Sequence, residues 1–251
     1  MQNTTIEWTD RTWNPTKGCS KVSEGCKNCY AMRMASRLEA MGQVHYQRLT
    51  RKSRGKLVWT GKVNFDERAL YAPLSWKKPS KIFVNSMSDL FHEGIDKDIL
   101  QRIWGVMSIC PQHQFQVLTK RPDRMLEILQ NQAEFPLLSN VWLGVSVENQ
   151  KQVSRLDILR EVPAHVRFVS FEPLIGPISG CSLDQIDSAI VGGESGQRSR
   201  PIKEDWVLEI QESCLRANTA FFFKQWGGVN KKQTGRKLNN QEFNAFPEMT
   251  V

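Results

Sequence analysis

The sequence predicts an α/β fold, a partial or complete parallel (β/α) barrel with an N-terminal cysteine loop, a basic insertion and a C-terminal tail. From Lys81 onward, short apolar segments alternate with segments whose apolar residues recur at helical spacing. Each apolar segment is followed by polar or glycine-rich residues, as at the carboxyl ends of barrel strands, where sites of such folds lie. The length of 251 residues suits one domain of this size.

Six short apolar runs are expected to be buried strands. They span residues 81–86, 114–120, 141–147, 166–171, 188–192 and 219–224. A shorter apolar-polar segment at about residues 12–17 is expected to form the first strand. We call the predicted carboxyl ends of these strands the mouth of the barrel.

Helical patterns lie between the strands. They span residues 30–41, 97–109, 122–130, 150–160 and 203–217. Strand, helix and strand repeated in this way predict a parallel sheet with helices outside it. We expect one domain over residues 1–251, with the insertion at about 42–79 and the tail at about 225–251.

Composition narrows the cellular setting and the partners. The formal net charge of +8 and the pI near 9.3 favour an anionic partner, such as a nucleic acid or a phosphorylated metabolite. The first residues lack the pattern of a signal peptide, and no stretch of about 18 apolar residues occurs. We therefore expect a soluble cytoplasmic protein with no membrane partner.

Three of the six cysteines are closely spaced, with six residues between Cys19 and Cys26 and two between Cys26 and Cys29. In a reducing compartment such a group indicates a metal or redox site rather than disulfides. The spacing fits both zinc and iron–sulfur chemistry. A closed zinc site needs a fourth ligand, and the nearest histidine, His45, lies beyond a predicted helix. Three thiolates also suffice for a [4Fe-4S] cluster with one open iron.

Three other cysteines are expected to be buried free thiols: Cys110, Cys181 and Cys214.

A three-cysteine loop just after the first strand of a parallel barrel, with Tyr30 beside the last cysteine and a helix following, resembles the radical S-adenosylmethionine (SAM) superfamily. The chain as a whole is similar to an uncharacterised phage and bacterial family of radical-SAM-like proteins with a three-cysteine motif. The segments that carry this likeness are WTDRTWNPTKGCSKVSEGCKNCYA, VWLGVSVEN, RFVSFEPLIGPI, IVGGESG and FFFKQWGG. The superfamily usually has three residues between the first two cysteines and an aromatic residue where this chain has Asn28.

The resemblance implies a mechanism. SAM would bind the open iron of a [4Fe-4S] cluster held by Cys19, Cys26 and Cys29. Its reductive cleavage would generate a 5'-deoxyadenosyl radical that abstracts hydrogen from the substrate. An electron donor such as flavodoxin or ferredoxin would reduce the cluster.

The resemblance and the strand ends together nominate two groups of binding residues. The candidates for SAM are Tyr30, Asn85, Ser86, Ser88, Lys120, Ser146 and Glu148. The candidates for the substrate are Glu172, Glu194, Lys224 and Gln225. Other interpretations stay open, because a glutamate after a strand also favours the start of a helix, and lysine is common on surfaces.

The substrate is expected to be anionic, with nucleic acid bases and nucleotides as the favoured classes. Two basic runs could border the mouth: Arg48, Arg51, Lys52, Arg54 and Lys56 in the insertion, and Lys231, Lys232, Arg236 and Lys237 in the tail. Three tryptophans could stack a base there: Trp59, Trp76 and Trp226. Each run by itself is more typical of a solvated loop, whereas the two runs together with the excess positive charge favour a nucleic acid or nucleotide.

Two other functions fit the same residues. In one, the cysteines and a remote histidine hold a structural zinc in a nucleic-acid-binding protein without catalysis. In the other, the cluster transfers electrons without SAM.

Overall fold

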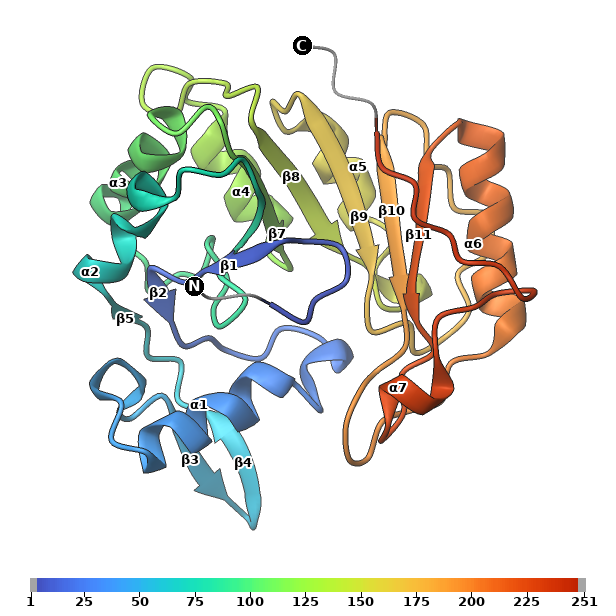
Figure 1. The fold of residues 1–251 in the computed structure, drawn as a ribbon, viewed down its shortest axis with the longest axis horizontal. Helices are drawn as coiled ribbons and strands as arrows, with labels where there is room; N and C mark the ends of the chain where they lie inside the picture. The colour runs from blue at the N-terminus through green and yellow to red at the C-terminus, as the bar shows by residue number, and fades with distance from the viewer. Residues whose placement is uncertain (1–3, 248–251) are drawn as a thin grey trace.

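A curled, parallel, seven-stranded sheet forms the centre of the computed structural model, which describes residues 4–247 (Figure 1). Its order is β1 (Arg11–Trp13), β6 (Lys81–Val84), β7 (Gln114–Thr119), β8 (Val141–Ser146), β9 (Val166–Phe171), β10 (Ser188–Gly192) and β11 (Ala220–Gln225). Every neighbouring pair is parallel. Within the described residues β11 does not pair with β1, so the sheet is a partial barrel. The α/β class and the parallel partial barrel are confirmed.

The helices that connect the strands cover the outer face of the sheet (Figure 1). They are α3 (Lys97–Ser108), α4 (Pro122–Leu129), α5 (Arg155–Glu161) and α6 (Glu204–Ala217). The helix expected over 150–160 is divided into a 3-10 turn η4 (Gln150–Gln152) and α5. The Asn149 side chain accepts a hydrogen bond from the Lys151 N–H and caps this separate turn.

Aromatic side chains fill the concave face of the sheet. Trp142, Phe168, Ile190 and Phe222 come from successive strands and form one buried cluster with Trp8. Trp8 comes from the segment before β1, is 2% exposed, and its ring centroid lies 4.7 Å from that of Phe83. The interior below the mouth is therefore solid, and open space remains only above this aromatic layer.

The first predicted strand, residues 12–17, is two strands. Residues Arg11–Trp13 join the sheet as β1, whereas β2 (Thr16–Lys17) pairs antiparallel with β5 (Asn64–Phe65). Pro15 separates them because proline has no N–H for the ladder. The Asn14 side chain accepts hydrogen bonds from the Ser86 hydroxyl (3.1 Å) and the Met87 N–H (3.0 Å), which ties this bend to the segment after β6. The cysteine loop follows, with η1 (Glu24–Cys26) and α1 (Tyr30–Ala40).

The segment expected as an insertion contains short elements: η2 (Val44–Tyr46), β3 (Thr50–Ser53), β4 (Lys56–Trp59), β5, α2 (Glu67–Leu70) and η3 (Ala72–Ser75). β3 and β4 form an antiparallel hairpin that packs against α1 and projects away from the sheet (Figure 1).

The tail covers an edge of the sheet rather than the mouth alone. After α7 (Lys231–Thr234), the Phe223 N–H donates to the Phe243 carbonyl (3.0 Å) and the Ala245 N–H to the Phe221 carbonyl (3.2 Å). Phe246 then packs on Phe222, with ring centroids 5.2 Å apart. The open edge of β11 is thus paired, which removes an unpaired strand edge from solvent. Among the described helices, none has the length and apolar character required to cross a bilayer.

Gly144 is required where β8 passes under the Phe168 ring. A Cβ at this position would lie 2.6 Å from both the ring and the carbonyl oxygen of Phe168. We therefore expect Gly144→Ala to lower the free energy of unfolding by about 1–3 kcal/mol through overpacking, measured by urea denaturation. The matched control is Gly105→Ala in α3, where an added Cβ meets nothing within 4 Å. The control should be neutral or stabilising, and equal effects at both positions would contradict this account of packing.

Candidate functional site

Two adjoining cavities lie at the carboxyl ends of the strands. The strand-end cavity, about 250 Å³, is lined by residues from β6 to β11 together with Cys26, Cys29 and Tyr30. The cysteine cavity, about 160 Å³, is lined by Cys19, Cys26 and Cys29 and by the segment after β6. The two cavities share several lining residues, so a molecule bound in one cavity would contact residues that also line the other.

Almost all of the residues nominated from the sequence line these cavities. The strand-end cavity is bordered by Cys26, Cys29, Tyr30, Lys120, Ser146, Glu172, Glu194, Lys224 and Gln225. The cysteine cavity is bordered by Cys19, Asn85, Ser86 and Ser88, and again by Cys26, Cys29, Tyr30, Lys120 and Ser146. The exception is Glu148, which is 1% exposed and lies behind Lys120.

The cysteine loop begins on a fixed point of the barrel. The Gly18 N–H donates to the Met87 carbonyl (3.0 Å), and the Ser88 hydroxyl donates to the Gly18 carbonyl (2.7 Å). Gly18 has φ +103°, and a Cβ there would lie 2.2 Å from the Lys62 carbonyl oxygen. Only glycine fits this position, so the start of the loop is held against the segment after β6.

Arg121 fixes the region around Cys19. Its guanidinium contacts Asp89 (2.9 Å) and both carboxylate oxygens of Glu93 (2.9 and 3.0 Å). It also donates to the Ser20 hydroxyl (2.7 Å) and lies 3.9 Å from the Cys19 sulfur. Because both acidic partners hold the side chain in place, Arg121 supplies a fixed positive charge beside this thiol.

Glu148 holds the middle of the loop. Its carboxylate accepts a hydrogen bond from Ser23 (2.7 Å) and pairs with Lys120 (3.2 Å) and Arg155 (3.2 Å). A Cβ on Gly25 would lie 2.5 Å from Glu148 Cγ, so the loop backbone packs directly on this side chain. Burial acts to raise the pKa of Glu148, but Lys120, Arg155 and Ser23 together hold it below its ordinary value.

Glu194 holds the end of the loop. It accepts a hydrogen bond from the Asn28 side chain (2.8 Å) and forms a two-point ion pair with Arg200 (2.6 and 3.0 Å). Arg200 also donates to the Glu24 carbonyl (3.0 Å). Burial acts to raise the pKa of Glu194, but the bonds from Arg200 and Asn28 lower it overall. Glu194 thus contacts the cysteine loop, and its nominated role toward substrate stays a prediction.

The three thiols face a common space. Burial, followed by the negative charge of Asp89, raises the pKa of Cys19 to about 12, and Cys26 and Cys29 add to this shift. Burial also raises the pKa of Cys29, whereas the backbone N–H groups of Met32 and Ala31 at the start of α1 oppose the rise. The three side chains line the same cavity, and a cation bound there would displace their protons.

Among residues 4–247, no histidine or unengaged carboxylate is placed as a fourth ligand for this group. The four histidines all lie in the described part of the chain, and none lines the cysteine cavity. His92 is already engaged by Ser20 through Nε2 and by the Gly94 N–H through Nδ1. Asp89 lines the cavity, but both of its oxygens already accept hydrogen bonds from Phe91, Thr119, Lys120 and Arg121.

A single metal ion requires ligands at fixed distances from one another. Within residues 4–247, no set of three or more His, Cys, Asp or Glu side chains is arranged to hold a metal ion. Thiolates around one zinc ion lie about 3.8 Å apart, as tetrahedral Zn–S bonds of about 2.3 Å require. The three thiols are free and half-buried and border one cavity, but in this structure they do not form such a set around a single ion.

The far wall of the strand-end cavity carries a second, half-buried ion pair. Lys224 contacts Glu172 at 2.9 Å. Burial acts to lower the pKa of Lys224, but Glu172 holds it above its ordinary value. Gln225 donates to the Gly193 carbonyl (3.1 Å), which leaves its side-chain oxygen buried without a partner. The Tyr30 hydroxyl donates to the Ser86 carbonyl (2.9 Å).

Only some of the tryptophans and basic residues that were predicted to border the mouth do so. Trp59 lines the cysteine cavity, and Trp226 follows β11 and donates to the Lys237 carbonyl. Trp76 lies at the opposite end of the sheet, under Arg11 and beside His113, so its predicted role in stacking at the mouth is wrong. The side chains of Lys231 and Lys232 fall outside the described part of the structure. The remaining three cysteines are buried free thiols, as expected: Cys110, Cys181 and Cys214.

Several residues that organise the site were not found from the sequence: Ser23, Asp89, Arg155 and Arg200. Ser23 and Glu148 are 125 positions apart, and Asn28 and Glu194 are 166 apart. No local pattern links residues that lie so far apart in the sequence. The charged residues at the strand ends are themselves visible in the sequence, as Lys120-Arg121, Glu148-Asn149 and Gly193-Glu194.

Comparison with known proteins gives a family but no activity. Residues 3–247 match DUF5131, a family described as proteins of unknown function, and the chain belongs to that family. No curated protein matches the chain. Among solved structures, a spore photoproduct lyase complexed with dinucleoside spore photoproduct matches with 12% identity and a TM-score of 0.39. The match covers 80% of this chain and 60% of that protein, so the chain spans less than two thirds of that protein's length.

Neutralising Glu148 tests whether its charge holds the site together. Because the folded-state pKa of Glu148 is lowered, its contribution to stability is present above the unfolded-state value of about 4.3. That contribution is lost as the pH falls through the lower folded-state value. Glu148→Gln should therefore cost about 3 kcal/mol at neutral pH, and the difference from wild type should shrink towards about pH 3, measured by urea unfolding.

The control for this variant is Glu127→Gln on the exposed face of α4. This variant removes one negative charge from a solvent-exposed position. Its free energy of unfolding should stay within about 0.5 kcal/mol of the wild-type value at every pH. A pH-independent loss in Glu148→Gln would show that shape rather than charge is responsible.

Proposed function

We propose that this DUF5131 protein is a radical SAM enzyme in which Cys19, Cys26 and Cys29 hold a [4Fe-4S] cluster with one iron open to SAM. One observation carries the proposal. Three free, half-buried thiols line a single cavity at the mouth of a parallel partial barrel, and the part of the chain that the structure describes places no fourth side chain to close the group. An incompletely ligated cluster is the arrangement that leaves a binding place for a second molecule.

When bound, the cluster and SAM supply reductive bond cleavage and hydrogen-atom abstraction, with electrons from a donor such as flavodoxin or ferredoxin. The chain supplies binding and orientation. Asn85, which is 3% exposed, lines the cysteine cavity and has a side-chain amide nitrogen without a partner. An unpaired buried donor costs free energy, so we assign it to a polar group of SAM. Ser86, Ser88 and Ser146 add hydroxyl groups along the same walls.

Lys120 provides the positive charge of this binding place. Its ammonium group borders both cavities and is anchored from behind by Glu148 at 3.2 Å. A carboxylate entering from the cavity side would gain a charge-assisted hydrogen bond. Because Glu148 is already engaged by three partners, its proposed effect on SAM acts through the position of Lys120.

The substrate would occupy the β9–β11 side of the strand-end cavity. Lys224 and Glu172 offer a charged pair there, and Gln225 offers a free acceptor for an N–H group. Ile6, Trp8 and Phe83 form an apolar floor that excludes water from the space between substrate and cluster. A mixed polar and apolar wall suits an anionic substrate with a ring system, such as a nucleotide or a nucleic acid base.

Cysteine substitution tests the cluster. Cys26→Ala should lose most of the iron and sulfide taken up on anaerobic reconstitution and should make no 5'-deoxyadenosine from SAM after reduction. The matched control is Cys110→Ala, which removes a buried thiol from the hydrophobic core outside the site. The control should retain iron and SAM cleavage at near wild-type levels, although with lower stability.

Two results would overturn the proposal. One is stoichiometric zinc with no iron uptake in the wild-type protein, which would support a structural metal site. The other is wild-type production of 5'-deoxyadenosine by Cys26→Ala.

A further inference from the structure

The strongest unassigned surface is the hairpin of the insertion. Residues 48–62 contain six Lys and Arg residues and no Asp or Glu. We call this segment the basic hairpin; its cations are Arg48, Arg51, Lys52, Arg54, Lys56 and Lys62. In the described part of the chain none of the six takes part in an ion pair, and those on the two strands and the turn are exposed. This surface carries positive charge without an internal partner.

The hairpin is short and its turn is tight. β3 and β4 have four residues each, and the last pair of the ladder is Ser53 with Lys56. The two turn residues, Arg54 and Gly55, have φ of +48° and +73°, as a two-residue hairpin turn requires. A non-glycine residue rarely adopts positive φ, so the turn holds a cation at the tip despite a conformational cost.

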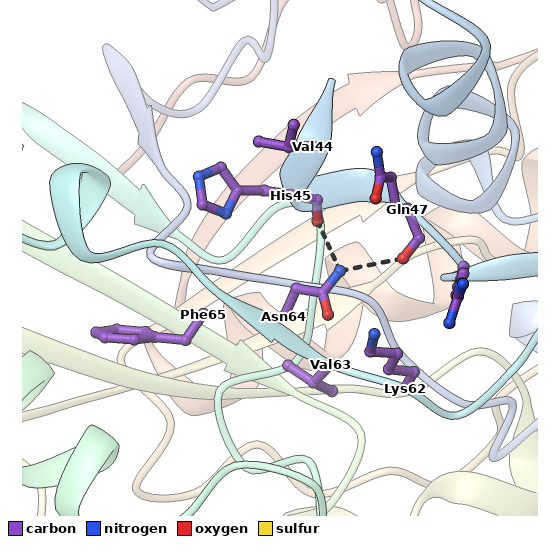
Figure 2. Close-up of a pocket in the computed structure, with 8 residues that line it drawn as sticks. Val44, His45, Gln47, Lys62, Val63, Asn64 and Phe65 are labelled. Carbon is purple, nitrogen blue, oxygen red and sulfur yellow. Dashed lines mark hydrogen bonds between the residues drawn. The ribbon is translucent and has the colours of Figure 1, made fainter. Parts of the chain in front are cut away.

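The base of the hairpin continues the basic surface. A cavity of about 410 Å³ lies there, and Arg48 and Lys62 are among the residues that line it. Figure 2 shows Asn64 donating to the carbonyls of His45 and Gln47, at 3.1 and 3.2 Å, which fixes the chain that leads into the hairpin. In the same view Lys62 and Gln47 lie on one side of Asn64 (Figure 2).

This surface adjoins the candidate site. β3 and β4 pack against α1, which begins directly after Cys29. Trp59, the last residue of β4, lines the cysteine cavity. A polymer that lies along the hairpin would therefore pass close to the mouth of the barrel.

We propose that the basic hairpin binds double-stranded DNA by entering the major groove with its two strands. β3 and β4 form a two-stranded ribbon whose strands lie about 4.8 Å apart, and the major groove, about 12 Å wide, admits a ribbon of this kind. A-form RNA has a narrow major groove that side chains cannot read. Single-strand binding uses exposed aromatic platforms, whereas Trp59, the one aromatic residue of the basic hairpin, is half-buried and lines the cysteine cavity. The idea that the bound DNA is also the substrate of the cysteine site rests on the proposed function. DNA binding by the hairpin does not depend on that function.

Binding is measured by fluorescence anisotropy with a labelled DNA duplex of about 20 base pairs, using the full-length protein without SAM. If four cations contact phosphates, affinity should fall about 100-fold between 50 and 200 mM salt. Single-stranded DNA and duplex RNA of the same sequence should bind at least about tenfold more weakly. Equal or tighter binding of either competitor would overturn the assignment to duplex DNA.

Two matched double variants locate the surface. Arg51→Ala with Lys52→Ala should weaken duplex binding about tenfold or more and reduce the salt slope by about 2. Lys77→Ala with Lys78→Ala removes the same charge from exposed residues just before β6, at the other end of the sheet, and should bind as wild type. Equal losses in both variants would overturn the proposal, because net charge alone would then explain binding.

Iron uptake on reconstitution separates this proposal from the function of the cysteines. The hairpin variant should load iron as wild type does and still lose duplex binding. Conversely, Cys26→Ala should bind duplex DNA normally even without a cluster. Loss of DNA binding in Cys26→Ala at wild-type thermal stability would place the interface at the cysteine loop and would overturn the assignment to the hairpin.

Discussion

The buried carboxylate of Glu148 is the constraint on which the site depends. Removing such a charge from water costs several kcal/mol unless partners replace the lost hydration. Here the partners come from three places: Lys120 after β7, Arg155 on α5 and Ser23 in the cysteine loop. All three partners surround the carboxylate only when the loop and the barrel are both in place. The free-energy cost of burying the Glu148 carboxylate therefore couples the position of the cysteine loop to the folding of the sheet.

The concave face of the sheet divides into two layers with different roles. Below, Trp8, Trp142 and Phe168 pack against one another and leave no space for a ligand. Above them, the same strands end in Ser146, Glu172 and Lys224, which border the cavities. Along a strand, every second residue faces the same side of the sheet. On the concave face the residues therefore change from aromatic to polar towards the end of each strand, and this change marks the boundary between the packed layer and the cavities. This boundary confines any reaction to the mouth.

Much of the fold was predictable from sequence, because parallel strands covered on both faces leave continuous apolar runs. The six later strands lie within two residues of their expected bounds. The split of the first strand was not predictable, since it depends on Asn14 contacting a segment about 70 positions away. Clustering of the nominated residues followed from parallel topology alone. The network around Glu194 and Asn28 could not be found, because it joins residues with no common local pattern.

The wide spacing between Cys19 and Cys26 has a structural explanation in the anchors of the loop. Doubling a loop's length adds only about 0.6 kcal/mol of closure entropy, which is less than one charge-assisted hydrogen bond contributes. Each part of this loop has its own such contact: Ser20 with Arg121, Ser23 with Glu148, and Asn28 with Glu194. A shorter loop would need fewer anchors but would bring fewer strand ends into contact with the thiols. The longer loop instead links the cysteines to the ends of β7, β8 and β10.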